Sequence, residues 1–178
     1  EGAISEANGG VSFTITSGDT DAPVTGEPIV IEAEEFTGLD DSDYFAQGSS
    51  AASGNGLIRL NVFEPTMVET VLPEAVSSGI YTVEITYFDE SDGQSSATAL
   101  IGDTEIGSWI FNNDGGGNAA QAQNLRTIEF NEVTIEAGQA FKLIGQRDLG
   151  EFVRIDKITL TRTDDLPVNQ PPTGTDIQ

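Results

Sequence analysis

From residue 28 to residue 163 the chain is a succession of short runs rich in β-branched and aromatic residues, separated by turn residues. The clearest run, residues 80–88, alternates apolar with mostly polar residues, so that Tyr81, Val83, Ile85 and Tyr87 are expected to face a core. Similar runs occupy residues 29–36, 56–60, 67–72, 96–101, 104–111, 125–135, 139–145 and 152–163. Because turn signals recur and no stretch has a helical period, the sequence predicts an all-β protein, an antiparallel β-sandwich.

Two glutamates interrupt the first of these runs. If residues 29–36 form one strand, Glu32 and Glu34 lie on the same face as Val30 and Phe36. Two neighbouring carboxylates on a core-forming strand repel each other and are costly to desolvate. Either this is an edge strand whose glutamates face water, or a hard cation such as Ca²⁺ compensates the charge. From this stretch alone, the edge strand with water-facing glutamates is the favoured alternative.

The charge and the missing residue types exclude several classes of function. The chain has 7 basic and 30 acidic residues, a net charge of −23, so we expect no nucleic acid and no anionic membrane surface as partner. It contains no cysteine and no histidine, which excludes disulfides, thiol nucleophiles and zinc sites built from those residues. The chain has no run of about 18 apolar residues, so we expect no segment that inserts into a membrane.

The composition at the two ends differs from that of the middle. Residues 1–27 are rich in Gly, Ser, Thr and Asp and predict a linker or an extra N-terminal edge strand, since residues 11–16 alternate. Residues 164–178 hold three prolines and predict a Pro-rich linker to a following domain. We therefore expect a monomeric domain, covalently linked to neighbouring domains, in a piece cut from a longer polypeptide.

Four segments, in order, carry a family resemblance. They are Ile-Glu-Ala-Glu-Glu-Phe at 31–36, Leu-Pro at 72–73 followed by Ser-Gly-Ile-Tyr-Thr-Val at 78–83, Glu-Val-Thr-Ile-Glu-Ala-Gly at 132–138, and Arg-Ile-Asp-Lys-Ile at 154–158. Together they resemble carbohydrate-binding modules of families 6, 35 and 36 over residues 28–163. The resemblance implies a jelly-roll β-sandwich with a structural calcium site.

The same resemblance implies which residues bind the ion. Carried over position by position, the calcium ligands are Glu32, Glu34 and Asp156. These carboxylates come from opposite ends of the domain, so the ion would couple the first strand to the last. The match at all three positions reverses the preference for water at residues 29–36.

The resemblance also implies a glycan site on loops at one end or edge of the sandwich, with stacking aromatics and an asparagine near the closing segment. Here Arg154 stands at the asparagine position, Ile58 and Arg59 stand where an aromatic residue is expected, and residues 115–124 contain no aromatic residue. Trp109 is the candidate replacement platform, unless its strand turns it into the core. The further ligand-binding candidates are Tyr44, Arg59, Asn112, Asn113, Asp148, Glu151 and Arg154.

Two groups of charged residues have alternative interpretations. Arg154 and Arg59 could form a local positive spot for an acidic sugar, or Arg154 could form an ion pair with Glu151 or another glutamate. Asp89 and Asp92 could bind a second calcium ion, or they could belong to a solvated acidic turn.

The sequence predicts a non-catalytic, calcium-dependent module for a polysaccharide, marine or acidic in character, within a larger secreted or cell-surface bacterial protein. It predicts no enzyme: among 30 acids no carboxylate pair stands out for glycoside hydrolysis, and no nucleophile or phosphate-loop signature occurs. A structural or adhesive spacer of the same fold stays open, because the usual stacking aromatics are missing.

Overall fold

The computed structural model describes residues 26–36, 44–112 and 116–164. The predicted ends, residues 1–27 and 164–178, lie almost wholly outside this range. No helix in the described residues is long and apolar enough to cross a membrane.

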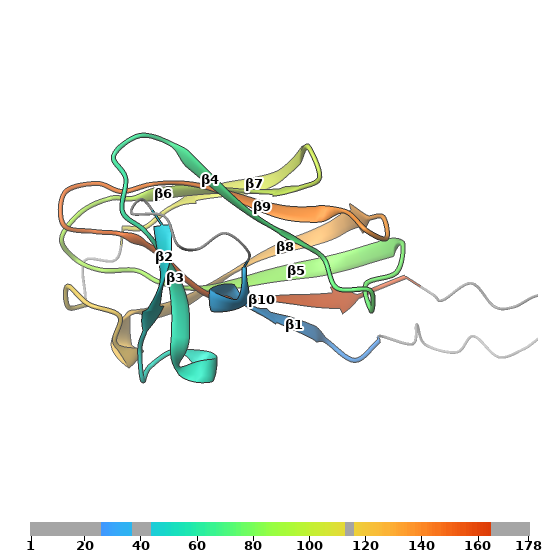
Figure 1. The fold of residues 1–178 in the computed structure, drawn as a ribbon, viewed down its shortest axis with the longest axis horizontal. Helices are drawn as coiled ribbons and strands as arrows, with labels where there is room; N and C mark the ends of the chain where they lie inside the picture. The colour runs from blue at the N-terminus through green and yellow to red at the C-terminus, as the bar shows by residue number, and fades with distance from the viewer. Residues whose placement is uncertain (1–25, 37–43, 113–115, 165–178) are drawn as a thin grey trace, which may run out of the picture.

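The domain consists of two antiparallel sheets packed face to face, which confirms the predicted all-β sandwich (Figure 1). The first sheet has the order β2 (Tyr44–Gly48), β3 (Gly56–Leu60), β10 (Val153–Arg162), β5 (Gly79–Phe88) and β8 (Leu125–Ile135), with β1 (Ile29–Glu32) also paired to β10. The second has the order β4 (Thr66–Val71), β9 (Ala140–Gln146), β6 (Ser96–Ile101) and β7 (Thr104–Ile110). Three single-turn 3₁₀ helices, η1 (Ala33–Glu35), η2 (Ser53–Asn55) and η3 (Ala122–Asn124), lie between strands.

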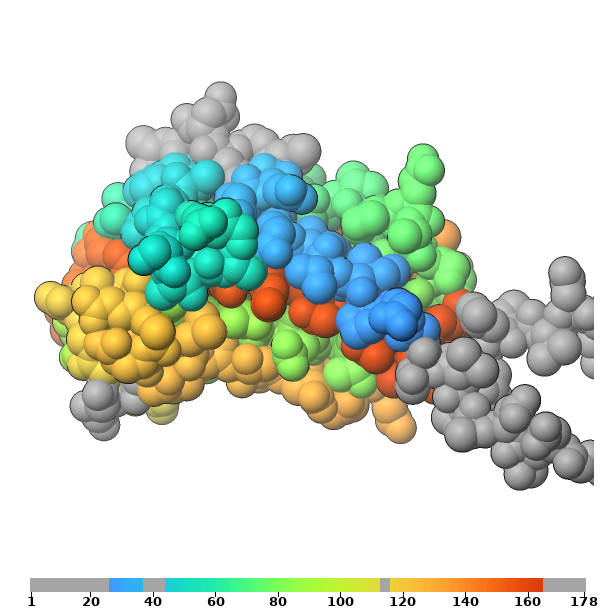
Figure 2. Space-filling view, turned by 90° about the horizontal axis from the view of Figure 1, so that it is seen from below, coloured from blue at the N-terminus to red at the C-terminus, as the bar shows by residue number. Residues whose placement is uncertain are grey.

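Strand alternation explains the core between the sheets. Tyr81, Val83, Ile85 and Tyr87 of β5 are all buried in it, as predicted. Their intervening neighbours point to the outer face of the first sheet, because successive side chains of a strand alternate. Figure 2 looks onto this outer face, where β1, β10, β5 and β8 follow one another as blue, red, green and orange bands.

The predicted strand at residues 29–36 is shorter than expected. β1 ends at Glu32, and η1 follows it. The turn places both Ala33 and Phe36 in the core, which an extended strand could not do with residues three apart. Glu32 and Glu34 therefore do not share a strand face, and that prediction is wrong.

A β-bulge interrupts the last strand. The register of β10 against β5 shifts between Ile155 and Lys157, which leaves Asp156 without a partner in the ladder. Ile155 and Ile158, three residues apart, are consequently both in the core. The bulge therefore ends the two-residue periodicity at Asp156 and turns its side chain toward η2.

The loops that follow β3, β5, β7 and β9 gather at one end of the sandwich, on the left of Figure 1. We call this the loop end. The start of β1 and the end of β10 lie at the other end.

Candidate functional site

Two loops at the loop end are joined by buried hydrogen bonds. The carboxylate of Glu151 accepts the backbone N–H groups of Glu90 at 2.8 Å and of Ser95 at 3.1 Å. The hydroxyl of Ser95 donates to the carbonyl of Glu151 at 2.6 Å, and Asp148 accepts the N–H of Gln94 at 3.0 Å. Glu151 is fully buried and Asp148 is engaged with the backbone, so these predicted ligand contacts instead hold residues 89–95 against residues 147–152.

The acidic residues in these two joined loops are less exposed than a solvated turn requires. Asp89 is buried next to Glu151, and Asp92 is half-buried. The pKa of Glu151 is raised to about 8, mainly by burial; the backbone hydrogen bond from Ser95 lowers it, and the neighbouring charges of Asp89 and Asp92 raise it. The solvated-turn alternative is wrong for Asp89, whereas a second calcium ion at Asp89 and Asp92 stays a prediction.

A row of side chains crosses the outer face of the first sheet at the loop end. Register places Phe45 of β2 opposite Arg59 of β3, Arg59 opposite Arg154 of β10, and Arg154 opposite Phe88 of β5. Directly opposed residues of antiparallel strands project to the same face. Their neighbours Ile58 and Ile155 face the core, so the row lies on the side away from it.

Three arginines of this region surround one aromatic ring. The guanidinium carbons of Arg59, Arg147 and Arg154 lie 3.5, 4.2 and 4.8 Å from the ring centre of Phe152. Arg59 also lies 5.3 Å from the ring of Phe45, and Arg147 lies 4.4 Å from that of Phe63. Each such cation–π contact stabilises by about 0.5–2 kcal/mol. We call these residues the arginine–phenylalanine cluster: Phe45, Arg59, Phe63, Arg147, Phe152 and Arg154.

The three arginines differ in their polar partners. Arg154 is buried and forms an ion pair with the fully buried carboxylate of Glu90, not with Glu151. Arg147 donates to Asn61 Oδ1 at 2.7 Å and to a backbone carbonyl. Burial and then the charge of Arg59 lower the pKa of Arg154 to about 10, while burial and then Arg147 lower the pKa of Arg59.

Two exposed apolar side chains lie at the rim of the cluster, its member Phe63 and the neighbouring Leu149. Phe63 is 59% exposed and Leu149 is 69% exposed, and Arg147 contacts both residues. Leu149 adopts a left-handed backbone conformation with φ of 49°, which is uncommon for a branched side chain. The sequence reasoning missed Phe63 and Leu149. The only sequence signal for either residue was that Phe63 is an aromatic residue in the polar turn after residues 56–60.

Trp109 and Tyr44 do not form an exposed aromatic platform. Trp109 is only 8% exposed and packs against Tyr87 and Phe111, with ring centres 5.8 and 6.0 Å away, so that prediction is wrong. Tyr44 packs against the core, and its neighbour Phe45 joins the cluster in its place.

The two predicted asparagines are placed differently. Asn112 is exposed, just beyond the end of β7. Asn113 lies outside the described residues.

The three carboxylates of the predicted calcium site approach η2 from different elements. The hydroxyl of Ser53 donates to Glu32 Oε2 at 2.5 Å, and its N–H donates to Asp156 Oδ1 at 2.8 Å. Glu34 lies against Gly54 and Gly56, where a side chain on either glycine would clash with its carboxylate. Across residues 26–36, 44–112 and 116–164, no three acidic side chains lie close enough together to form a ready-made metal site.

The electrostatics of these carboxylates suit a cation. Burial is the main cause that raises the pKa of Glu34, and the charges of Glu32 and Asp156 add to it. Burial also raises the pKa of Asp156. Oxygen Oε2 of Glu34 is buried and accepts no hydrogen bond from the described residues. An oxygen-binding cation would compensate both the charge and the unsatisfied oxygen.

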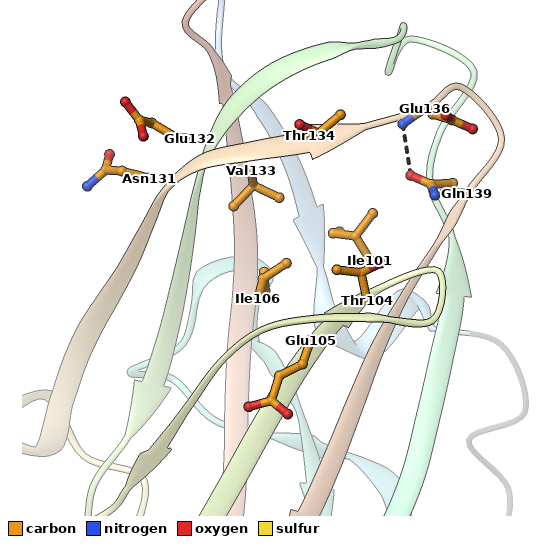
Figure 3. A pocket seen from close by; sticks show the side chains of 10 residues that line it. All are labelled: Ile101, Thr104, Glu105, Ile106, Asn131, Glu132, Val133, Thr134, Glu136 and Gln139. Carbon is orange, nitrogen blue, oxygen red and sulfur yellow. Dashed lines mark hydrogen bonds between the residues drawn. The ribbon is translucent and has the colours of Figure 1, made fainter.

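A separate pocket lies at the opposite end of the domain (Figure 3). It has a volume of about 440 Å³ and opens between the β6–β7 hairpin and β8. Ile101, Ile106 and Val133 line its interior, and Glu105, Glu132 and Glu136 stand around it. It contains none of the predicted site residues.

No protein-family model matches the sequence. One curated relative is a probable alpha-glucuronidase A of Aspergillus niger, 28% identical over 153 residues. The match covers 80% of this chain and 18% of the fungal protein, so the chain spans less than a fifth of that relative.

Solved structures share the fold at low sequence identity. The C-terminal family 6 module of the marine laminarinase LamC from Zobellia galactanivorans is 22% identical, with a TM-score of 0.54 over 76% of this chain and 100% of that one. A family 35 module from Clostridium thermocellum is 11% identical, with a TM-score of 0.58 over 76% and 98%. The CBM36-1 domain of a xylanase from the hindgut metagenome of Trinervitermes trinervoides is 15% identical, with a TM-score of 0.52 over 75% and 96%.

The strand order, the two packed sheets and these structural matches agree with the family resemblance that the four sequence segments carry. The described domain therefore has the β-sandwich fold of the carbohydrate-binding modules of families 6, 35 and 36.

Proposed function

We propose that the domain is a non-catalytic carbohydrate-binding module that binds polysaccharide at the arginine–phenylalanine cluster. The observation that carries this proposal is the exposed ring of Phe63 beside the guanidinium group of Arg147, which shares the ring of Phe152 with Arg59. An aromatic ring packs against the apolar face of a sugar, and nearby N–H groups can donate to its hydroxyls. The proposal extends to an acidic polysaccharide, because the cluster is cationic in a strongly acidic protein.

We also propose that the module depends on calcium for its shape. Glu32, Glu34 and Asp156 would hold the ion, and the buried, unsatisfied oxygen of Glu34 supports this assignment. When bound, the ion would supply positive charge that ties β1 and η1 to β10. These residues hold the scaffold, and the glycan is bound at the cluster.

The proposed setting is a larger secreted or cell-surface bacterial protein. Tethering to a catalytic or adhesive neighbour would raise the local concentration of that neighbour at the polysaccharide. A matching structure comes from a marine laminarinase, so marine polysaccharides belong among the candidate ligands.

Affinity electrophoresis and calorimetry against neutral, uronic and sulfated polysaccharides, each with calcium or EDTA, test this function. We expect binding to at least one polysaccharide in calcium and weaker binding in EDTA. If the folded domain binds none of them, the spacer alternative holds. Release of product by the isolated chain would contradict both interpretations.

Replacement of Phe63 by alanine is expected to weaken polysaccharide binding about 10- to 100-fold. The variant loses the apolar ring that a sugar would cover, and burying such a side chain contributes about 1.5–3 kcal/mol to the free energy of binding. Calorimetry with the best ligand of the panel measures the change. The matched control is Val71→Ala, at another exposed apolar side chain, on the edge strand β4. Equal affinities of the two variants would show that the sugar binds elsewhere.

A further inference from the structure

The arginine–phenylalanine cluster concentrates positive charge to an unusual degree for this chain. Three of its seven basic residues surround a single ring in a protein with 30 acidic residues. Burial, and then the neighbouring charge of Arg147, lowers the pKa of Arg59. Such an arrangement costs free energy unless negative charge meets it.

The protein itself supplies one negative charge to the cluster. Glu90 reaches Arg154 from the β5–β6 loop and is completely buried there, so it neutralises the deepest of the three arginines. Arg147 uses its two terminal nitrogens on neutral oxygens, Asn61 Oδ1 and the Leu149 carbonyl. Two positive charges therefore stay uncompensated by these contacts.

Arg59 differs from Arg147 and Arg154 in having no polar partner among the described residues. It contacts two aromatic rings but makes no hydrogen bond or ion pair with any described residue, and its buried Nε atom is unsatisfied. The rings of Phe45 and Phe152 hold the guanidinium in place from the sides. A guanidinium fixed in this way presents a fork that fits a carboxylate or a sulfate.

We infer, on the basis of the proposed function, that the site selects sugars that carry an anionic substituent, and that Arg59 receives this substituent. Arg147 adds attraction through its charge. Phe63 and Leu149 pack on the ring of the same or the next sugar. Glu90 keeps Arg154 from competing with Arg59 for the anion. A carboxylate of a uronic acid and a sulfate ester offer the same chemistry to Arg59, and experiment distinguishes them.

Calorimetry with polygalacturonate, a carrageenan and a neutral galactan, in calcium and at two salt concentrations, tests the inference. We expect at least one anionic polymer to bind more tightly than galactan, with an affinity that falls as salt rises. If only polygalacturonate binds more tightly than galactan, the group that Arg59 receives is a carboxylate. If only the carrageenan does, that group is a sulfate. If galactan binds as tightly as both anionic polymers, the preference for an anionic sugar is overturned, while the proposal that the domain binds carbohydrate stands. If nothing binds, the proposed function fails as well.

The variant Arg59→Met identifies the receiving group. Methionine keeps an unbranched apolar stem between the two rings, so the fold is expected to persist, as thermal melting will show. The ratio of anionic to neutral affinity is expected to fall about 10- to 100-fold, since a charge-assisted hydrogen bond is lost. Lys142→Ala, which removes the same charge beside the β6–β7 turn, should leave the ratio unchanged. An unchanged ratio in Arg59→Met would overturn the assignment of Arg59.

Discussion

Replacement of Glu90 by alanine is expected to destabilise the domain by about 3–5 kcal/mol, because it leaves the buried guanidinium of Arg154 without its counter-charge. Glu90 is fully buried, Arg154 is 5% exposed, and the two form an ion pair. Neither group can turn to solvent without moving a loop that Glu151 fixes through two backbone hydrogen bonds. Urea unfolding at pH 7 measures the loss.

Two further variants separate the charge from the packing. The double variant Glu90→Leu, Arg154→Met replaces the pair by apolar groups and should recover most of the stability, since no buried charge is left unpaired. Glu64→Ala, at an exposed glutamate, should change stability by less than about 0.5 kcal/mol. A Glu90→Ala variant as stable as Glu64→Ala would show that the ion pair does not form in solution.

Calcium is expected to raise the melting temperature of the unmodified domain by about 10 °C at a concentration 1,000-fold above its dissociation constant. This follows from a stabilisation of about 4 kcal/mol at that ratio and about 2–4 °C per kcal/mol for a domain of this size. Asp156→Asn should abolish the response, because it removes a carboxylate that Ser53 holds in place beside η2. Calorimetry with calcium or EDTA checks both expectations, with Glu64→Gln as the matched control. Melting that is indifferent to calcium in the unmodified domain would refute the metal site.

The response to pH should differ with and without the ion. In EDTA, Glu34 and Asp156 have pKa values raised above those of the unfolded chain, so their contribution to stability is present below the unfolded values. That contribution is lost as the pH rises through the folded values. Calcium binds the deprotonated carboxylates, so the stabilisation it gives should instead increase over the same pH range. The difference between the two melting curves should therefore widen with pH and disappear in Asp156→Asn.

The fold was largely predictable because its signal is local. Tyr81, Val83, Ile85 and Tyr87 alternate with outward-facing residues, and the structure buries all four. Alternation could not place Trp109, because both faces of its strand carry large apolar residues. The choice between the faces depends on which one meets the other sheet, and that is a long-range property.

The candidate site was predictable only in part. The bulge at Asp156 and the turn after Glu32 are backbone irregularities that break strand periodicity, and only the family resemblance connected these two positions. The cluster around Phe152 joins Arg59 to Arg147 across 88 residues, through register and loop contacts that no local pattern encodes. In the sequence Glu90 is one of three acids between residues 89 and 92, with nothing to distinguish it, whereas the fold buries it against Arg154.

A titration of the ¹⁵N-labelled domain with an oligosaccharide of the best-binding polymer, followed by NMR, tests the central claim most directly. The account predicts that the largest amide shifts occur at Arg59, Phe63, Arg147 and Phe152, at the loop end. Shifts centred instead on Ile106 and Val133, in the pocket at the opposite end, would contradict the assignment of the binding site.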